Sequence, residues 1–315
     1  MKMHLSILFF LSLFSFASKA TPDTVKIGAY VMSIHDINFR DKEYTMRFWL
    51  WMLHNKQNLD VIKQTEIPNA KSVERSEIFI DSLGDKEWVI MKMKSVMKQS
   101  WKVNDYPFDK QYLNVQFENT EYNKDELVFK EDKTGSAYEK ELAVDGWNIT
   151  NFETTTGENV YETSFGNDVD GEASYIYATF NILITLERNA FGLFLKLFVG
   201  MYIAFLIAMV SFLVDPKDIE PRFGLPVGAL FAAVGNKYII DSLLPETSSF
   251  TLVDSLHTFT FVAIFLIIFI SAFATSAFRK KQFGKYKKIN KYGGLAVIGL
   301  YTVLNLLFIG LALWH

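Results

Sequence analysis

Four long apolar runs towards the end of the chain restrict this sequence more than any other feature. They cover residues 191–214, 223–244, 256–278 and 293–314, and each is about 22–24 residues long. About 20 apolar residues in a helix cross a hydrocarbon core of ~30 Å. Within lipid, only helices and closed barrels satisfy every backbone hydrogen bond. The sequence therefore predicts four transmembrane helices.

The first twenty residues have the pattern of a secretory signal peptide. Lys2 supplies a positive charge, residues 5–16 are apolar apart from serine, and residues 17–20 include small residues suited to cleavage. A further membrane helix is the alternative, but this apolar stretch is shorter than the roughly 20 residues that spanning requires. We expect residues 1–20 to be removed, so that the mature chain begins outside the membrane.

Residues 21–188 are polar enough to form a water-exposed domain, and they carry strand patterns. Residues 112–118 alternate between apolar and polar, and residues 44–53 and 175–186 are rich in strand-forming side chains. Several strands at this spacing predict an antiparallel, immunoglobulin-like β-sandwich. The expected fold class is thus an all-β sandwich domain followed by an all-α four-helix transmembrane domain in residues 189–315.

The distribution of charge predicts the orientation in the membrane. Residues 279–292 contain seven Lys and Arg residues and no acid, as expected of a cytoplasmic loop between the third and fourth helices. Residues 245–250, after the second helix, contain no Lys or Arg. The chain is therefore predicted to be a multi-pass protein of the cell inner membrane, with its outer domain in the periplasm.

Composition and motifs argue against several functional classes. The net charge of −3 shows no bias towards nucleic acid. The absence of cysteine excludes disulfides, thiolate metal sites and cysteine nucleophiles. No zincin, dinucleotide-binding, P-loop or nucleophile-elbow motif occurs. We expect no enzyme activity, no cofactor, no metal site and no nucleic-acid partner.

The second apolar run contains a stripe of residues at helical spacing. The stripe consists of Gly224, Gly228, Phe231, Gly235 and Tyr238. One interpretation is close helix packing, because Gly224 and Gly228 form a GxxxG motif. The other is a lumen lined by small residues, in which Phe231 forms an apolar constriction that gates by dewetting. Periodicity alone favours packing, because GxxxG is common in membrane helices.

A short motif in the outer domain consists of Tyr106, Pro107, Phe108, Asp109 and Gln111. It reads aromatic-Pro-Phe-Asp-x-Gln. This pattern resembles the core of the signature loop of the pentameric ligand-gated ion channels, the Cys-loop receptor superfamily. Bacterial members lack the flanking cysteine pair, as this chain does. The order of signal peptide, β-domain, motif, Arg188 and four helices is also similar, so the resemblance covers nearly all of the mature chain.

The resemblance implies a homopentamer in which the second helix of each subunit lines a central pore. Counted back from Pro245 without a gap, the lining positions coincide with the glycine-rich stripe, which now favours the lumen interpretation. The inner mouth falls at Glu220 and Arg222. A ring of Glu220 carboxylates would favour cations, whereas a ring of Arg222 would favour anions. We expect a preference for cations, although Pro221 separates the two residues and the family often has them adjacent.

The resemblance also implies the sites for coupling and for ligand binding. Coupling between the domains would use the signature loop, Arg188 and Pro245, with Asp109 paired to Arg188. The agonist, which the sequence does not identify, would bind between adjacent outer domains. Its candidate contacts are Trp49 on one side and Tyr161, Phe165 and Tyr175 on the other. Aromatic rings suit cationic ligands, but each ring alone also fits an ordinary sandwich. Protons remain a second candidate agonist.

Two other functional classes deserve comparison. The alternative function is a non-conducting, membrane-anchored periplasmic sensor or scaffold, in which the glycine stripe packs helices and does not line water. A transporter would show inverted repeats and broken helices, and no repeat is visible among the four apolar runs. The partners expected for the channel are identical subunits, a small-molecule agonist, permeant ions and membrane lipid.

Overall fold

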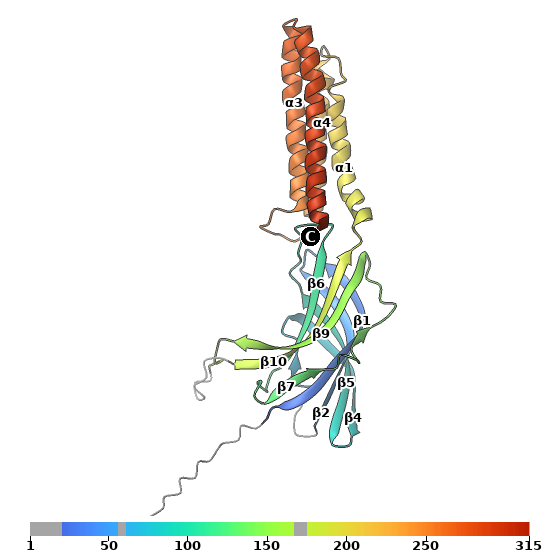
Figure 1. Cartoon of the computed structure of the whole chain (residues 1–315), viewed down its shortest axis with the longest axis vertical. Coiled ribbons are helices and arrows are strands. Elements are labelled where there is room, and N and C mark those ends of the chain that lie inside the picture. Colours follow the sequence, from blue (N-terminus) through green and yellow to red (C-terminus); the bar gives the residue numbers. More distant parts are fainter. Residues whose placement is uncertain (1–20, 56–60, 167–174, 315) are drawn as a thin grey trace, which may run out of the picture.

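The computed structural model of the protein describes residues 21–55, 61–166 and 175–314. The predicted signal peptide, residues 1–20, therefore lies outside the described residues. Figure 1 shows a β-rich domain at one end of the molecule and a bundle of long helices at the other. This layout confirms the predicted order of a β-rich N-terminal region followed by four apolar helices.

The outer domain contains two sheets. The strands of its described residues are β1 (Asp23–Asn38), β2 (Glu43–Asn55), β3 (Thr65–Glu66), β4 (Ala70–Leu83), β5 (Lys86–Lys98), β6 (Lys110–Asn119), β7 (Leu127–Glu131), β8 (Ala137–Tyr138), β9 (Trp147–Tyr161) and β10 (Tyr175–Arg188). One sheet has the order β4-β5-β2-β1-β7, with β8 paired to β1, and the other has the order β3-β6-β10-β9.

The sheets are not purely antiparallel, which corrects the prediction. Most neighbouring strands are antiparallel, but β1 pairs with β7 and with β8 in parallel. Parallel neighbours require a long crossover connection. The chain between β1 and β7 passes through both sheets before it returns, so it can approach β1 in the same direction. Local alternation of side chains does not reveal such a distant pairing.

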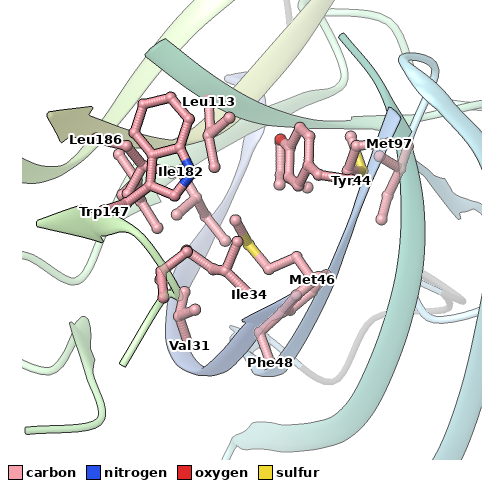
Figure 2. Packing of buried hydrophobic residues seen from close by; sticks show 14 of the residues in the cluster. Val31, Ile34, Tyr44, Met46, Phe48, Met97, Leu113, Trp147, Ile182 and Leu186 are labelled. Atoms are coloured by element: carbon pink, nitrogen blue, oxygen red, sulfur yellow. The ribbon is translucent and has the colours of Figure 1, made fainter. Parts of the chain in front are cut away.

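The core of the outer domain lies between the two sheets. Inward-facing residues of β2, among them Tyr44, Met46 and Phe48, are fully buried. The ring of Phe48 meets that of Phe117 on β6 edge-on, with 5.6 Å between centroids, and so joins the sheets. Figure 2 shows Tyr44, Met46 and Phe48 together with Ile182 of β10. Each large buried apolar side chain contributes about 1.5–3 kcal/mol, and this packing holds together a domain that has no disulfide.

Four helices follow the outer domain. They are α1 (Ala190–Val210), α2 (Ile219–Asp241), α3 (Leu252–Arg279) and α4 (Phe283–Trp314). All four are long and apolar enough to cross a membrane, which makes the chain a multi-pass membrane protein. α3 begins four residues before its apolar run, because Thr251 and Asp254 form a capping box that satisfies the backbone at its start.

The fourth helix is longer than its apolar run predicts. The expected basic loop of residues 279–292 is mostly helical, because α4 already begins at Phe283. Lysine is a good helix former, and residues 279–292 contain no proline. Hydropathy therefore locates the part of the helix that crosses hydrocarbon, but it does not locate the end of the helix.

The two domains contact each other through the signature loop. The backbone N–H of Leu252, at the start of α3, donates to the carbonyl of Asn104 at 2.7 Å. The ring of Phe108 lies 5.4 Å from that of Phe194 on α1, between centroids. β10 continues into α1 after only one residue outside regular structure. Residues 104–108, in and just before the signature motif, therefore touch the ends of α1 and α3 that lie nearest the β-domain.

Candidate functional site

The predicted stripe of α2 lies on one exposed face of the helix. Phe231 and Tyr238 are 72% and 77% exposed. A Cβ added to Gly224, Gly228 or Gly235 would meet, within 4 Å, no atom of the described residues beyond the adjacent turns of α2. The GxxxG motif therefore packs no helices together within the described part of this chain. We call the five residues of the stripe the open face of α2.

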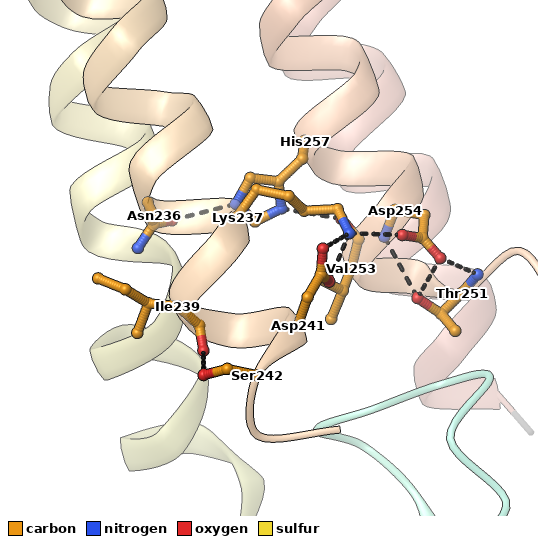
Figure 3. Close-up of polar contacts among 9 residues, drawn as sticks. All are labelled: Asn236, Lys237, Ile239, Asp241, Ser242, Thr251, Val253, Asp254 and His257. Carbon is orange, nitrogen blue, oxygen red and sulfur yellow. Dashed lines mark hydrogen bonds and ion pairs between the residues drawn. The ribbon is translucent and has the colours of Figure 1, made fainter. Parts of the chain in front are cut away.

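The opposite side of α2 packs against α1 and α3. Its buried apolar residues are Pro226, Ala229, Ala233 and Ile240. Asn236 adds polar links, because its amide donates to the carbonyl of Leu197 on α1 at 3.1 Å and its Oδ1 lies 3.0 Å from Nε2 of His257 on α3. Figure 3 shows the Asn236–His257 contact between the two helices. These contacts fix the orientation of α2 about its own axis, and they therefore determine the direction in which the open face points.

An ion-pair network joins the outer ends of α2 and α3. The ammonium of Lys237 lies 2.5 Å from Asp241 on its own helix and 2.7 Å from Asp254 on α3. Asp254 also accepts from the backbone N–H of Thr251 at 2.8 Å. Figure 3 shows Lys237 between the two carboxylates. A single lysine thus pairs with a carboxylate on each of the two helices, close to both ends of the segment that connects α2 to α3.

Arg222 does not face the same way as Glu220 at the inner end of α2. Arg222 is fully buried, and its guanidinium donates to the carbonyl of Val214 at 2.8 Å and to Oδ1 of Asn290 on α4. The Asn290 amide in turn donates to the carbonyl of Phe212 at 2.7 Å. Arg222 therefore links α2 to α4 within the chain and points away from the open face of α2.

Helix geometry explains this separation. Residues two apart on a helix lie roughly 200° apart around its axis. Glu220, in contrast, precedes Gly224 by four residues, so it continues the open face towards the inner end. Glu220 is exposed. The two candidates of the inner mouth therefore lie on opposite sides of α2.

The predicted pair at the domain junction is present. Nε of Arg188 lies 2.6 Å from Oδ1 of Asp109, and its Nη2 lies 3.1 Å from Oδ2. The two side chains are 10% and 2% exposed. The Gln111 amide, which belongs to the same motif, donates to Oδ2 of Asp109 at 2.6 Å. A bidentate pair of this kind is stronger and more directional than a single contact.

Three aromatic rings surround the Arg188 guanidinium, and sequence reasoning did not find this arrangement as a whole. The ring centroids of Phe39, Tyr106 and Trp147 lie 4.8, 4.9 and 3.9 Å from its central carbon. They come from the turn after β1, the signature loop and β9, so no local pattern connects them. Pro107 and Pro245, the two prolines of the predicted coupling site, are both buried.

The hairpin of β9 and β10 brings three predicted ligand contacts together. The ring of Phe165 lies 5.5 Å from Tyr161 and 6.1 Å from Tyr175, between centroids. Tyr177, which sequence reasoning missed, joins them at 5.7 Å from Tyr161. Trp49 lies in the other sheet, beneath the Lys92 ammonium at 5.3 Å, and does not belong to this cluster. We call the four rings of the hairpin the aromatic cluster.

A buried carboxylate supports the aromatic cluster. Glu118 on β6 is 1% exposed and accepts from the Tyr161 hydroxyl at 2.9 Å, from Asn159 at 2.6 Å and from Gln116 at 2.5 Å. Burial and this hydrogen bond raise the pKa of Tyr161 to about 12. Burial, and then the nearby Glu118 charge, also raise the pKa of Glu66. The sequence carries no signal for Glu118, because a charged residue on the outward side of a strand is normally solvated.

No protein-family model matches this sequence, and no curated protein is significantly similar to it. Three features of the described residues bear on function: the open face of α2, the Asp109–Arg188 junction and the aromatic cluster.

Proposed function

We propose that this chain is one subunit of a bacterial-type pentameric ligand-gated ion channel. In this proposal α2 of each subunit lines a central pore that prefers cations, and a ligand bound between outer domains opens it. The outer domain lies in the periplasm and the helices lie in the inner membrane. The observation that carries the proposal is the open face of α2, which the chain itself leaves uncovered.

The chemistry of the open face suits water better than lipid. The exposed surfaces of the other three helices carry many large apolar residues, for example Leu206, Phe265 and Leu306, with single exposed glycines such as Gly299 and Gly310 among them. The open face instead carries three glycines, and it continues into Glu220. Glycines exposed to lipid would bury no apolar surface there. Around a central axis, they would leave space for hydrated ions.

Phe231 is the natural constriction of such a pore. It lies near the middle of α2, between Gly228 and Gly235. In a pentamer, the five Phe231 side chains would form an apolar constriction, with glycine residues lining the pore on either side. A hydrophobic constriction can close a pore by dewetting without blocking it completely. Glu220 would then form a ring of carboxylates at the inner mouth, where it attracts cations.

An exposed edge strand of the outer domain supports the proposal that several copies of the chain assemble. β4 lies at the edge of its sheet and exposes Ile78, Phe79 and Ile80 by 45%, 56% and 58%. An exposed apolar edge of this kind promotes aggregation unless another chain covers it. Neighbouring subunits would cover it in a closed ring.

The ligand site of this proposal is the aromatic cluster. Its rings and the Glu118 carboxylate beneath Tyr161 form an environment suited to a cationic ligand. Trp49, from the other sheet, would complete the site from the neighbouring subunit. The competing proposal, a non-conducting sensor or scaffold, would instead bury the open face against other helices.

Bilayer recording with a matched pair of variants tests the proposal. Purified protein is first measured for oligomer mass in detergent and then recorded against a panel of amines and a pH series. Phe231→Ala is expected to increase the open probability or the leak current, because it removes the apolar constriction. Phe265→Ala, a lipid-exposed change on α3, is the control and should leave currents unchanged. A monomer, or equal currents from both variants, would contradict the proposal.

A further inference from the structure

The first ten residues of α4 carry cations on one side of the helix. The exposed ones are Lys285, Lys287, Lys288 and Lys291. Half-buried residues lie between them and face the bundle, and these are Tyr286, Ile289 and Asn290. Residues 279–281 add three further exposed cations, and residues 279–292 contain no acid. We call the four lysines the basic face of α4.

Helix length places the basic face beside the membrane and outside its hydrocarbon. α4 has 32 residues, which at 1.5 Å per residue is ~48 Å, whereas the hydrocarbon is ~30 Å thick. Residues 293–314 are apolar and end at Trp314, a residue type that favours the membrane interface. These residues span ~33 Å. Residues 283–292 therefore lie among the headgroups of the opposite leaflet.

The basic face is electrostatically unfavourable without an anion. The start of a helix carries a partial positive charge, which disfavours nearby cations. α4 has no acidic residue in its first turn, yet three lysines occur within its first six residues. Within the described residues, none of the four lysines forms an ion pair with a carboxylate. An external anion would relieve both the repulsion among the lysines and the repulsion from the helix.

We propose that the basic face of α4 binds anionic phospholipid headgroups, in the leaflet that the predicted orientation makes cytoplasmic. The four lysines carry the charge opposite to that of the headgroups and lie at the same depth in the membrane. The helix places all four on one side. A basic segment that only determines the membrane orientation does not need its lysines on one side of a helix. Asn290, on the bundle side of the same turns, holds Arg222 of α2. Bound lipid thus steadies the segment that anchors the inner end of α2.

Native mass spectrometry of the full-length protein in detergent tests this inference without any ion flow. The probes are palmitoyl-oleoyl phosphatidylglycerol and, as the neutral comparison, palmitoyl-oleoyl phosphatidylcholine. The test variant replaces the basic face with glutamine at Lys285, Lys287, Lys288 and Lys291. The matched control replaces four exposed lysines of the outer domain with glutamine, at Lys86, Lys98, Lys130 and Lys140. Residues 279–281 stay unchanged in both variants, so the charge that orients the chain is retained.

The wild type is expected to retain phosphatidylglycerol in preference to phosphatidylcholine, and the control variant should do the same. Each lost lysine should weaken binding about fivefold, and the loss of all four by about 600-fold. If that variant does not insert, the double change at Lys287 and Lys291 should still weaken binding by about 25-fold. Equal retention by wild type and basic-face variants, or equal binding of both lipids, would overturn the inference. Either outcome leaves the channel proposal untouched, because the assay records no current.

Discussion

The Asp109→Asn substitution tests the domain junction most directly. It keeps the size and shape of the side chain but removes the charge that faces Arg188. Both partners are almost fully buried, and their contact is bidentate. The change therefore leaves an uncompensated guanidinium inside the protein, which is far more costly than the loss of a surface ion pair.

The magnitude follows from the surroundings of the pair. Removing one partner of a buried ion pair costs about 3–5 kcal/mol. Two features favour the lower end here: asparagine retains one carbonyl acceptor, and three aromatic rings still contact the Arg188 cation. A loss of about 3 kcal/mol corresponds to a decrease of ~6–12 °C in the melting temperature of a domain of this size.

Thermal unfolding in detergent, followed by tryptophan fluorescence, measures the effect. Glu187→Gln is the matched control, because Glu187 is adjacent to Arg188 and lies 4.0 Å from Lys110 in an exposed pair. Such a pair contributes less than about 1 kcal/mol, so the control should lower the melting temperature by less than about 4 °C. If the two variants unfold at the same temperature, the junction is not a buried ion pair of consequence and the reasoning fails.

Three further predictions concern the other sites. Glu220→Gln should shift the reversal potential in asymmetric salt towards anions, because it removes a carboxylate ring; an unchanged potential rejects that assignment. The pKa of Tyr161 is raised from 10.0 to about 12 by burial and by Glu118, so the stability it contributes is complete below pH 10 and is lost between pH 10 and about 12. The difference between the ultraviolet titrations of wild type and Tyr161→Phe should therefore have its midpoint near pH 12, and a midpoint near 10 would refute this. Gly228→Ala should raise the melting temperature, since alanine favours a helix by ~1 kcal/mol over glycine and its Cβ meets no described atom within 4 Å; Gly293→Ala, whose Cβ would lie 2.6 Å from an α3 side chain, should lower it. Equal shifts of the two glycine variants would contradict the packing argument.

Several features of the fold and the sites could be predicted because they depend on local or periodic properties of the chain. The apolar runs predict helices, since lipid leaves the backbone few alternatives. The spacing of Gly224, Gly228 and Phe231 places them on one side of any helix, whatever covers it. The Asp109–Arg188 pair was predicted from the resemblance of its motif, and the structure contains it.

Other features could not be predicted, because they depend on residues distant in sequence. The resemblance gave both Glu220 and Arg222 as residues of the inner mouth, but the Arg222 guanidinium donates to Asn290, far along the chain on α4. Glu118 is buried only because the β9–β10 hairpin supplies Asn159 and Tyr161 as donors. Neither partner can be inferred from the neighbours of these residues.

The sequence by itself determined the number and approximate span of the helices, the β-rich domain before them and the residues that share the stripe of α2. Hydropathy and side-chain period are properties of consecutive residues, so folding does not alter them. Only the tertiary structure decided which side of α2 the chain covers, which direction β7 runs beside β1 and where α4 begins. These depend on the packing and hydrogen bonding of segments far apart in the chain, which become neighbours only in the folded protein.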